Sequence, residues 1–276
     1  MITNAPTLEE LLACPTLPSL PAVALQVIEL TSDDNVSMDE LASTIQADQA
    51  LAAKVLRTVN SSFYGLRERC ASIRKALVLL GLSPVKSLTL GFSLVNAVNT
   101  DDERGFDYVD YWRRGLFTAV GARVLSDAAG LDTADEAFLA GLLQDIGMIA
   151  MLEALGPEYA EIVATTEGDH SKLARAELTA FDMQHPEIGA MLAQRWRLPD
   201  QLSIPIRYHE KPSAAPNEGA KLVYAVALGN IACSVLSDED PTPATRRLYQ
   251  RAEQWFRLTT DQCNDALQRI NEGAAE

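Results

Sequence analysis

The chain has 276 residues, of which 47% are apolar, so it is long enough to bury a large core as one domain or as two closely packed lobes. It carries 38 acidic and 23 basic residues, a formal net charge of −15, which disfavours nucleic acid and anionic membrane surfaces as partners because both are polyanionic. The four cysteines include no C-x-x-C pair, which argues against a zinc knuckle or a disulfide framework.

The first residues lack the basic and apolar regions of a signal peptide. The longest nearly uncharged run, residues 222–236, is shorter than the roughly 20 residues with which a helix crosses a bilayer. We therefore expect a cytoplasmic protein with no membrane partner, in which this run is a buried core helix.

Apolar residues recur at spacings of three and four along almost the whole chain, and no useful stretch shows the alternation of a strand. The predicted fold class is all-α, with about a dozen helices. Helix starts are indicated by capping boxes, by an N-cap and by a Ser-Pro pair. They lie at Thr7-x-x-Glu10, Ser37-x-x-Glu40, Asp48, Ser83-Pro84 and Thr133-x-x-Glu136. Breaks are expected at Gly65, Gly81, Gly105, Gly130, Gly156-Pro157 and residues 212–216.

The polar segment at residues 99–104 separates two periodic apolar regions and suggests a boundary just before Gly105. We expect an N-terminal helical lobe over residues 1–104 and a second helical lobe over residues 105–212. The Pro-rich segment after Lys211 sets off residues 213–276, whose apolar helices should pack back on the second lobe.

Six short blocks occur in order along most of the chain. They read LPSLPAV (17–23), IQADQAL (45–51), KVLRTVNSSFYG (54–65), SIRKALVLLG (72–81), QD (144–145) and HPEIGA (185–190). Each block alone is weak, but their order and spacing together are specific. On these residues the chain resembles the HDOD family, the HD-related output domains of bacterial signalling proteins. One departure is Gln49, where the family often has proline.

The resemblance implies an HD-like fold, with positions that match the metal ligands of HD-type phosphohydrolases. Those enzymes carry a first His, a His-Asp pair and a last Asp. The matching positions here read Arg114, Gln144-Asp145 and Asn230. Two neutral amides and a permanent cation bind a divalent metal poorly. The sequence therefore predicts a degenerate site with no metal, no cofactor and no catalytic residue.

An Asp145 carboxylate left buried without a metal needs a compensating charge. We expect Arg114 to supply it as a guanidinium fork. The alternative is that Arg114 faces solvent on its helix.

His185 and His209 could form a reduced metal site with Asp145, since histidines resembling these are ligands in some binuclear HD relatives. Glu210 is a further candidate for this residual pocket. The alternative is structural, because His185-Pro186 begins a predicted helix and His209 ends one, where histidines commonly cap or hydrogen-bond.

Asn60, Phe63 and Tyr64 lie where an amphipathic helix ends. Exposed aromatic residues beside small polar ones make good interface anchors, so this segment is a candidate docking surface. The alternative places Phe63 or Tyr64 in the core of the lobe.

The function favoured by the resemblance is a non-catalytic regulatory module of bacterial two-component or cyclic-dinucleotide signalling. It would contact another signalling protein in trans and would take a small ligand in the former metal pocket. Two alternatives stay open. One is a divergent phosphohydrolase built on Asp145, His185, His209 and Glu210. The other is a nucleotide-binding sensor in which Arg113, Arg114 or Arg123 holds a phosphate.

Overall fold

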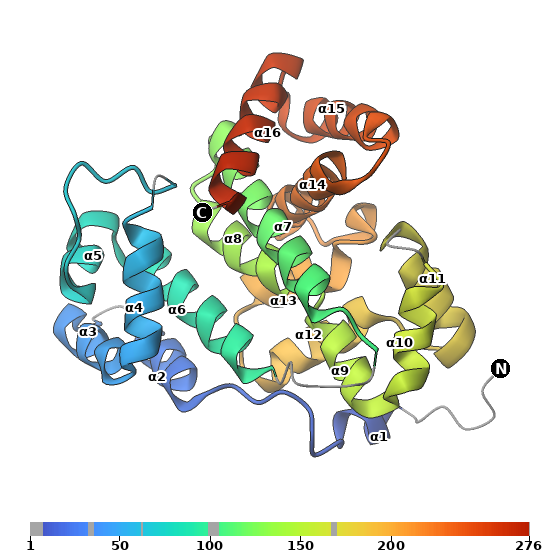
Figure 1. Ribbon diagram of the computed structural model, residues 1–276, viewed down its shortest axis with the longest axis horizontal. Coiled ribbons are helices and arrows are strands. Elements are labelled where there is room, and N and C mark those ends of the chain that lie inside the picture. Colours follow the sequence, from blue (N-terminus) through green and yellow to red (C-terminus); the bar gives the residue numbers. More distant parts are fainter. Residues whose placement is uncertain (1–7, 33–35, 62, 99–104, 167–169, 276) are drawn as a thin grey trace.

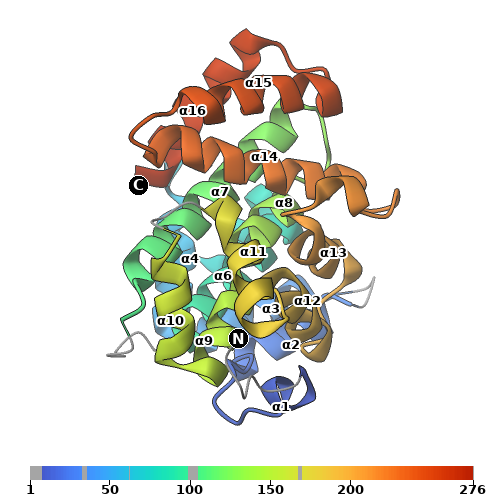
Figure 2. The ribbon, with the colours of Figure 1, turned by 90° about the vertical axis from the view of Figure 1, so that its right-hand side faces the viewer.

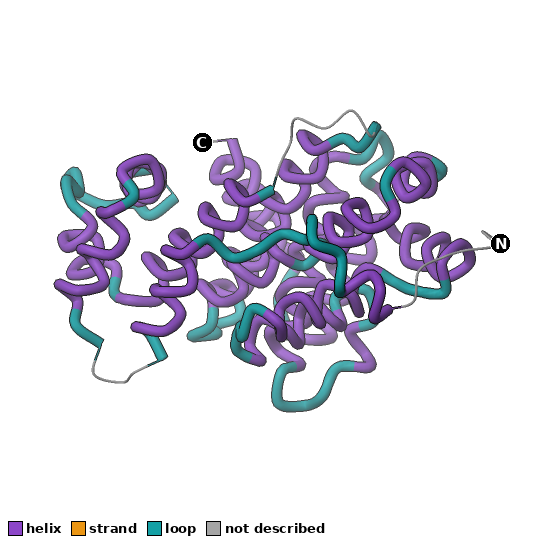
Figure 3. The backbone as a smooth tube through the Cα atoms, turned by 90° about the horizontal axis from the view of Figure 1, so that it is seen from below, coloured by secondary structure: helices purple, strands orange, loops and turns teal. Residues whose placement is uncertain are grey.

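The computed structural model describes residues 8–32, 36–61, 63–98, 105–166 and 170–275, and every regular element in these ranges is helical (Figure 3). The all-α prediction is confirmed. Within these ranges the chain forms sixteen α-helices and one short 3-10 helix, more than the dozen expected. Single-residue breaks such as Asp48 contribute to the larger number.

Figure 1 labels the helices in the order in which they occur along the chain. The first six are α1 (Leu8–Leu12), α2 (Ala22–Leu30), α3 (Met38–Ala47), α4 (Gln49–Val59), α5 (Ile73–Leu80) and α6 (Leu82–Ala97). The middle six are α7 (Tyr108–Ala128), α8 (Ala134–Leu143), α9 (Ile146–Leu155), α10 (Pro157–Ala164), α11 (His170–Phe181) and α12 (His185–Arg195). The last elements are α13 (Asp200–Tyr208), the 3-10 helix η1 (Pro212–Ala214), α14 (Ala220–Ser237), α15 (Thr242–Phe256) and α16 (Thr260–Ala275).

Several predicted helix starts are confirmed by capping bonds. The hydroxyl of Ser37 accepts from the amide of Glu40 at 3.3 Å, and the carboxylate of Asp48 accepts from the amide of Leu51 at 3.0 Å. Two details were wrong: Thr133 makes no side-chain capping bond, and α6 begins just before Ser83. The Thr7 capping box includes a residue outside the described ranges.

The predicted breaks at glycine are confirmed by the backbone. The five glycines lie in the positive-φ region that other residues rarely adopt. They are Gly65, Gly81, Gly105, Gly130 and Gly156, with φ between 57° and 87°.

Helix α7 occupies the centre of the molecule, with α8, α14 and α16 packed on it (Figures 1 and 2). The C-terminal helices α14 and α16 thus pack on α7, whereas the expected division of the chain at residue 213 stays a prediction. The buried apolar residues form one continuous cluster that reaches from Leu11 to Ile270. The boundary at residue 104 falls in a segment outside the described ranges, so the division into two lobes stays a prediction.

Two apolar stretches, Ala134–Leu155 and Ala220–Ser237, are long enough to cross a membrane by length and composition alone. In the structure, 83% and 50% of the most apolar 18-residue windows of these stretches are buried inside the fold. Both supply core helices, which accounts for their apolar composition.

Close helix packing in two places depends on glycine. A Cβ on Gly147 of α9 would lie 1.9 Å from the carbonyl oxygen of His185, the first residue of α12. A Cβ on Gly229 of α14 would lie 2.4 Å from the carbonyl oxygen of Thr118 on α7. The absence of a side chain at Gly147 therefore allows His185 to approach the turn that carries Asp145.

We expect Gly147→Ala to destabilise the fold by about 3 kcal/mol, because the new methyl group must push α12 away from α9. Chemical denaturation of the purified variant measures this. Gly115→Ala is the matched control: its Cβ would meet nothing closer than 3.4 Å, so helix propensity makes it neutral or slightly stabilising. Equal stability of the two variants would contradict the close approach.

Candidate functional site

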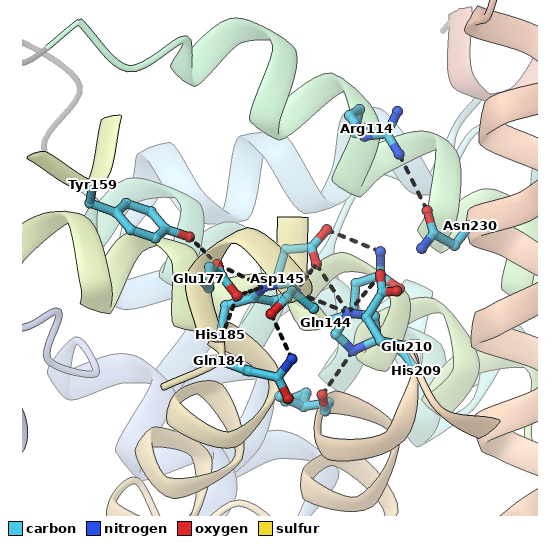
Figure 4. A network of polar contacts seen from close by, with 12 residues as sticks. Arg114, Gln144, Asp145, Tyr159, Glu177, Gln184, His185, His209, Glu210 and Asn230 are labelled. Atoms are coloured by element: carbon cyan, nitrogen blue, oxygen red, sulfur yellow. Dashed lines mark hydrogen bonds and ion pairs between the residues drawn. The ribbon is translucent and has the colours of Figure 1, made fainter. Parts of the chain in front are cut away.

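Asp145 occupies the turn between α8 and α9 and is 5% exposed. It stands at the N-cap position of α9, yet its side chain makes no capping bond. Its carboxylate instead points into the interior, where Gln144 Nε2 donates to Oδ2 at 3.0 Å (Figure 4). The turn thus presents a buried carboxylate to the neighbouring helices.

Two histidines meet this carboxylate. His185, at the start of α12, places Nε2 3.4 Å from Asp145 Oδ1, and His209, just after α13, places Nε2 3.2 Å from the same oxygen. The two Nε2 atoms are 3.3 Å apart. Asp145, His185 and His209, all buried, therefore converge as the sequence analysis considered.

A second set of groups orients both imidazole rings. Glu177 on α11, fully buried, accepts from Nδ1 of His185 at 2.8 Å and from its backbone amide at 2.9 Å. Tyr159 on α10 donates its hydroxyl to Glu177 at 2.6 Å. On the other ring, Nδ1 of His209 lies 2.8 Å from the carbonyl oxygen of Ile206, to which it can donate. Each ring then has its Nδ1 occupied and its Nε2 directed at Asp145.

The positive charge in this network is carried by His185. Burial by itself lowers the pKa of an imidazole, but the Glu177 charge and the hydrogen bonds to Asp145 and Glu177 outweigh it and raise the pKa of His185 to about 10. Without a metal, a protonated His185 would place one positive charge between the two buried carboxylates, and Tyr159 adds a hydrogen bond to Glu177. A metal bound at Nε2 must displace that proton.

The cluster also fits a metal ion. Ligand atoms about 2.0–2.1 Å from a zinc or iron ion lie about 3.0–3.4 Å from one another, which matches the three distances here. Many such sites use two imidazoles and one carboxylate as ligands. In those sites the outer ring nitrogens of the imidazoles are hydrogen-bonded, as they are here. The metal-free site expected from the sequence stays a prediction, and this geometry weighs against it.

The other two matched positions lie away from the cluster. Arg114 on α7 donates from Nη2 to Asn230 Oδ1 on α14 at 3.4 Å, and Figure 4 shows its guanidinium directed at Asn230. The expected ion pair between Arg114 and Asp145 is not among the contacts of the described residues. Histidines and Gln144 already surround the carboxylate, which removes the reason for that pair.

Glu210 lies at the edge of the cluster, with Oε1 3.8 Å from His209 Nε2 and its side chain partly exposed. It is next to His209 in the chain and beyond the end of α13. The structure thus brings it beside the residual pocket, as proposed from the sequence, but outside the three converging ligands.

The candidate docking residues make contacts within the chain. Asn60 closes its loop by bonding the backbone of Cys70 at 2.7 and 2.8 Å. Phe63 and Tyr64 are half-buried under Arg123 of α7, whose guanidinium carbon lies 4.9 and 4.5 Å from the two rings. These contacts are structural, and a role in docking stays a prediction.

Glu177 and Tyr159 were not predicted from the sequence. A signal existed for Glu177, since it stands four residues from Leu173 and four from Phe181, both buried on the apolar face of α11. An acidic residue on an apolar face needs a buried partner. Tyr159 gave no comparable signal, because a buried tyrosine in an apolar helix is ordinary.

Residues 17–212 match the HDOD domain family. The chain belongs to the HDOD family. The match covers the cluster residues, whereas α14, α15 and α16 lie beyond it.

Relatives of this HDOD protein include an uncharacterised protein of Treponema pallidum, 28% identical over 89% of the chain. The chain spans about half the length of that relative, 47% of it. A solved HDOD domain protein of unknown function from Geobacter sulfurreducens has a TM-score of 0.71 at 22% identity, covering 96% of this chain and 97% of the other.

Two further solved structures carry more specific names. A Shewanella amazonensis protein provisionally named a phosphohydrolase has a TM-score of 0.77 at 23% identity, covering 96% of this chain and 95% of its own. The response regulator MmoQ of Methylococcus capsulatus has a TM-score of 0.51 at 27% identity, covering 92% and 98%. The first of these shows the fold alone.

We expect Glu177→Gln to weaken zinc binding by about 10–100-fold, because it removes the charge that orients His185 and raises its basicity. Titration with Zn²⁺ against a competing chelator measures the affinity. Glu158→Gln, an exposed change on α10, is the control and should bind zinc as the unmodified protein does. Unchanged affinity in Glu177→Gln, or no zinc binding by the unmodified protein, would contradict the metal fit.

We expect Phe63→Ala to lower the free energy of unfolding by about 2 kcal/mol, less than for a fully buried phenylalanine, because the ring packs on Arg123 and Phe138. Val78→Ala, at a residue 76% exposed on α5, should change it by less than about 0.5 kcal/mol. Denaturant titration compares the two. A Phe63→Ala protein as stable as Val78→Ala would show that these contacts are not structural.

Proposed function

We propose that this HDOD protein is a non-catalytic signalling module. It acts through contact with another signalling protein and responds to a small ligand bound beside the Asp145 cluster.

The observation that carries the proposal is the identity of three residues at the positions that match HD metal ligands, namely Gln144, Arg114 and Asn230. Resemblance to HD hydrolases would put an imidazole where Gln144 stands, and here a neutral amide donates to the carboxylate. The positions matching the other two ligands, Arg114 and Asn230, bond to each other. These groups supply no good ligand for a metal ion beyond the one that Asp145, His185 and His209 could hold. The positive charge of Arg114 would repel such an ion.

The names of similar proteins agree with a signalling role. The response regulator MmoQ is 27% identical to this chain. A Marinobacter aquaeolei protein provisionally named for signal transduction shares the fold, with a TM-score of 0.68 at 24% identity, over 94% of this chain and 60% of its own. Membership of the HDOD family supports a role in signalling. The partner protein and its pathway are part of the proposal.

A second candidate function is metal-dependent phosphoester hydrolysis, favoured by the convergence of Asp145, His185 and His209. These three residues would hold one ion. A metal in such a site supplies Lewis acidity and lowers the pKa of a bound water. The residues themselves would fix the ion and, through Glu177, hold the His185 ring in place.

The two functions differ in turnover. We expect no hydrolysis of bis-p-nitrophenyl phosphate or of cyclic dinucleotides by the protein supplied with Mn²⁺, Fe²⁺ or Zn²⁺, because the second half of the site offers no metal ligand. Release of p-nitrophenol and chromatography of the nucleotides measure this. A metal-only blank sets the baseline.

Two variants make the result decisive. Gln144→His restores the missing imidazole and should increase the amount of metal retained, measured by elemental analysis. Asp145→Asn removes the shared carboxylate and should reduce it. Metal-dependent turnover by the unmodified protein that disappears in a folded Asp145→Asn protein would establish the hydrolase and overturn the proposal.

A further inference from the structure

A cavity of about 1100 Å³ lies beside the Asp145 cluster, slightly larger than the roughly 300–1000 Å³ that is usual for ligand sites. Helices α7, α14 and α15 and the segment after α13 form its walls. Its lining includes Arg114 and Asn230 at one side, His209 and Glu210 at the cluster, and Trp255 on α15. The cavity therefore joins the matched positions of the former metal site to the C-terminal helices.

Among the described arginine, aspartate and glutamate residues that line this cavity, Arg114 is the one that is buried. It is 8% exposed, and among the described residues its guanidinium has one hydrogen bond, the 3.4 Å contact to Asn230. Its buried Nε has no partner. A buried permanent cation with so few partners is costly, so an anion beside it would be strongly stabilised.

The other candidate arginines are already paired. Arg113, one residue away and largely exposed, bonds to Asp110 at 2.5 Å. Arg123 bonds to Asp135 and to the hydroxyl of Tyr64, both at 2.8 Å, outside this cavity. Of the three arginines considered for holding a phosphate, Arg114 is thus the one whose guanidinium has no carboxylate partner among the described residues.

The shape of the cavity indicates more than a bare ion. Its volume far exceeds that of a phosphate, and Tyr224 and Trp255 stack at 4.6 Å with 10° between their planes to form an aromatic wall. A ligand with an oxyanion at one end and a flat or apolar body would contact both regions.

We propose that this cavity binds a small organic oxyanion, whose phosphate or carboxylate group lies on the guanidinium of Arg114, with Asn230 beside it. A guanidinium fork suits both anions. The inference rests on the proposed function in one respect: it names the class of the small ligand. It requires neither a metal nor turnover.

The test compares three probes that share one ring: phenyl phosphate, benzoate and neutral benzyl alcohol. Calorimetry and thermal unfolding at constant ionic strength measure binding to the full chain. We expect phenyl phosphate, benzoate or both to bind and raise the Tm, while benzyl alcohol does not. The anion that binds with the higher affinity identifies the oxyanion that the site prefers.

Arg114→Met tests the role of the guanidinium. Binding of the preferred anion should weaken at least about 10-fold, because a charge-assisted hydrogen bond is lost. The Tm without ligand should stay equal or rise, since a poorly partnered buried cation has been removed. A merely structural arginine would instead give a lower Tm with the anion response intact.

Arg74→Met is the control, because Arg74 is an exposed arginine on α5 that does not line this cavity, and the change should affect neither the Tm nor the anion affinity appreciably. If Arg114→Met does not fold, Arg114→Lys keeps the charge without the fork and should still weaken binding. Absence of anion binding by the unmodified protein, or equal binding by the folded Arg114 variant, would overturn the inference. None of these binding measurements depends on turnover, so either negative result would leave the proposal of a non-catalytic protein unaffected. A positive hydrolysis assay, in turn, would not change what the binding measurements show.

Discussion

Charge compensation of two buried carboxylates is the constraint on which the centre of this fold depends. Asp145 and Glu177 lie on either side of the His185 ring, one at each of its nitrogens. A carboxylate in the interior is tolerated only when hydrogen bonds and an opposite charge accompany it. The turn after α8, the start of α12 and the buried face of α11 must therefore meet at one place, and Gly147 leaves the space for that meeting.

The same constraint explains how the site can be stable in two states. A proton on His185 or a metal ion can supply the positive charge, and each excludes the other at Nε2. Metal affinity would then depend on the competing proton as well as on the ligands. The amides of Gln144 and Asn230 therefore do not leave the site without polar structure, because Glu177 and Tyr159 hold the His185 ring from its Nδ1 side.

Local features of the fold could be predicted from the sequence, whereas pairings between distant residues could not. Glycine breaks and the Asp48 cap depend on a few neighbouring residues, and they were predicted correctly. The partner of Arg114 depends on how α7 and α14 pack, and sequence reasoning chose Asp145 over Asn230 because only the charges were visible. Glu177 was overlooked for a related reason: its importance arises from the His185 ring it meets in space.

The separation of Arg114 from Asp145 divides the candidate site into two parts with different chemistry. One half, around Asp145, satisfies its charges internally. The other half places Arg114 and Asn230 at a cavity whose far wall, including Trp255, comes from helices beyond the residues that match the family. A ligand on Arg114 would thus touch α7, α14 and α15 together, and its binding energy would favour one arrangement of those helices over others. In the proposed binding mode, the groups that contact the body of the ligand therefore belong to the C-terminal helices and lie outside the Asp145 cluster.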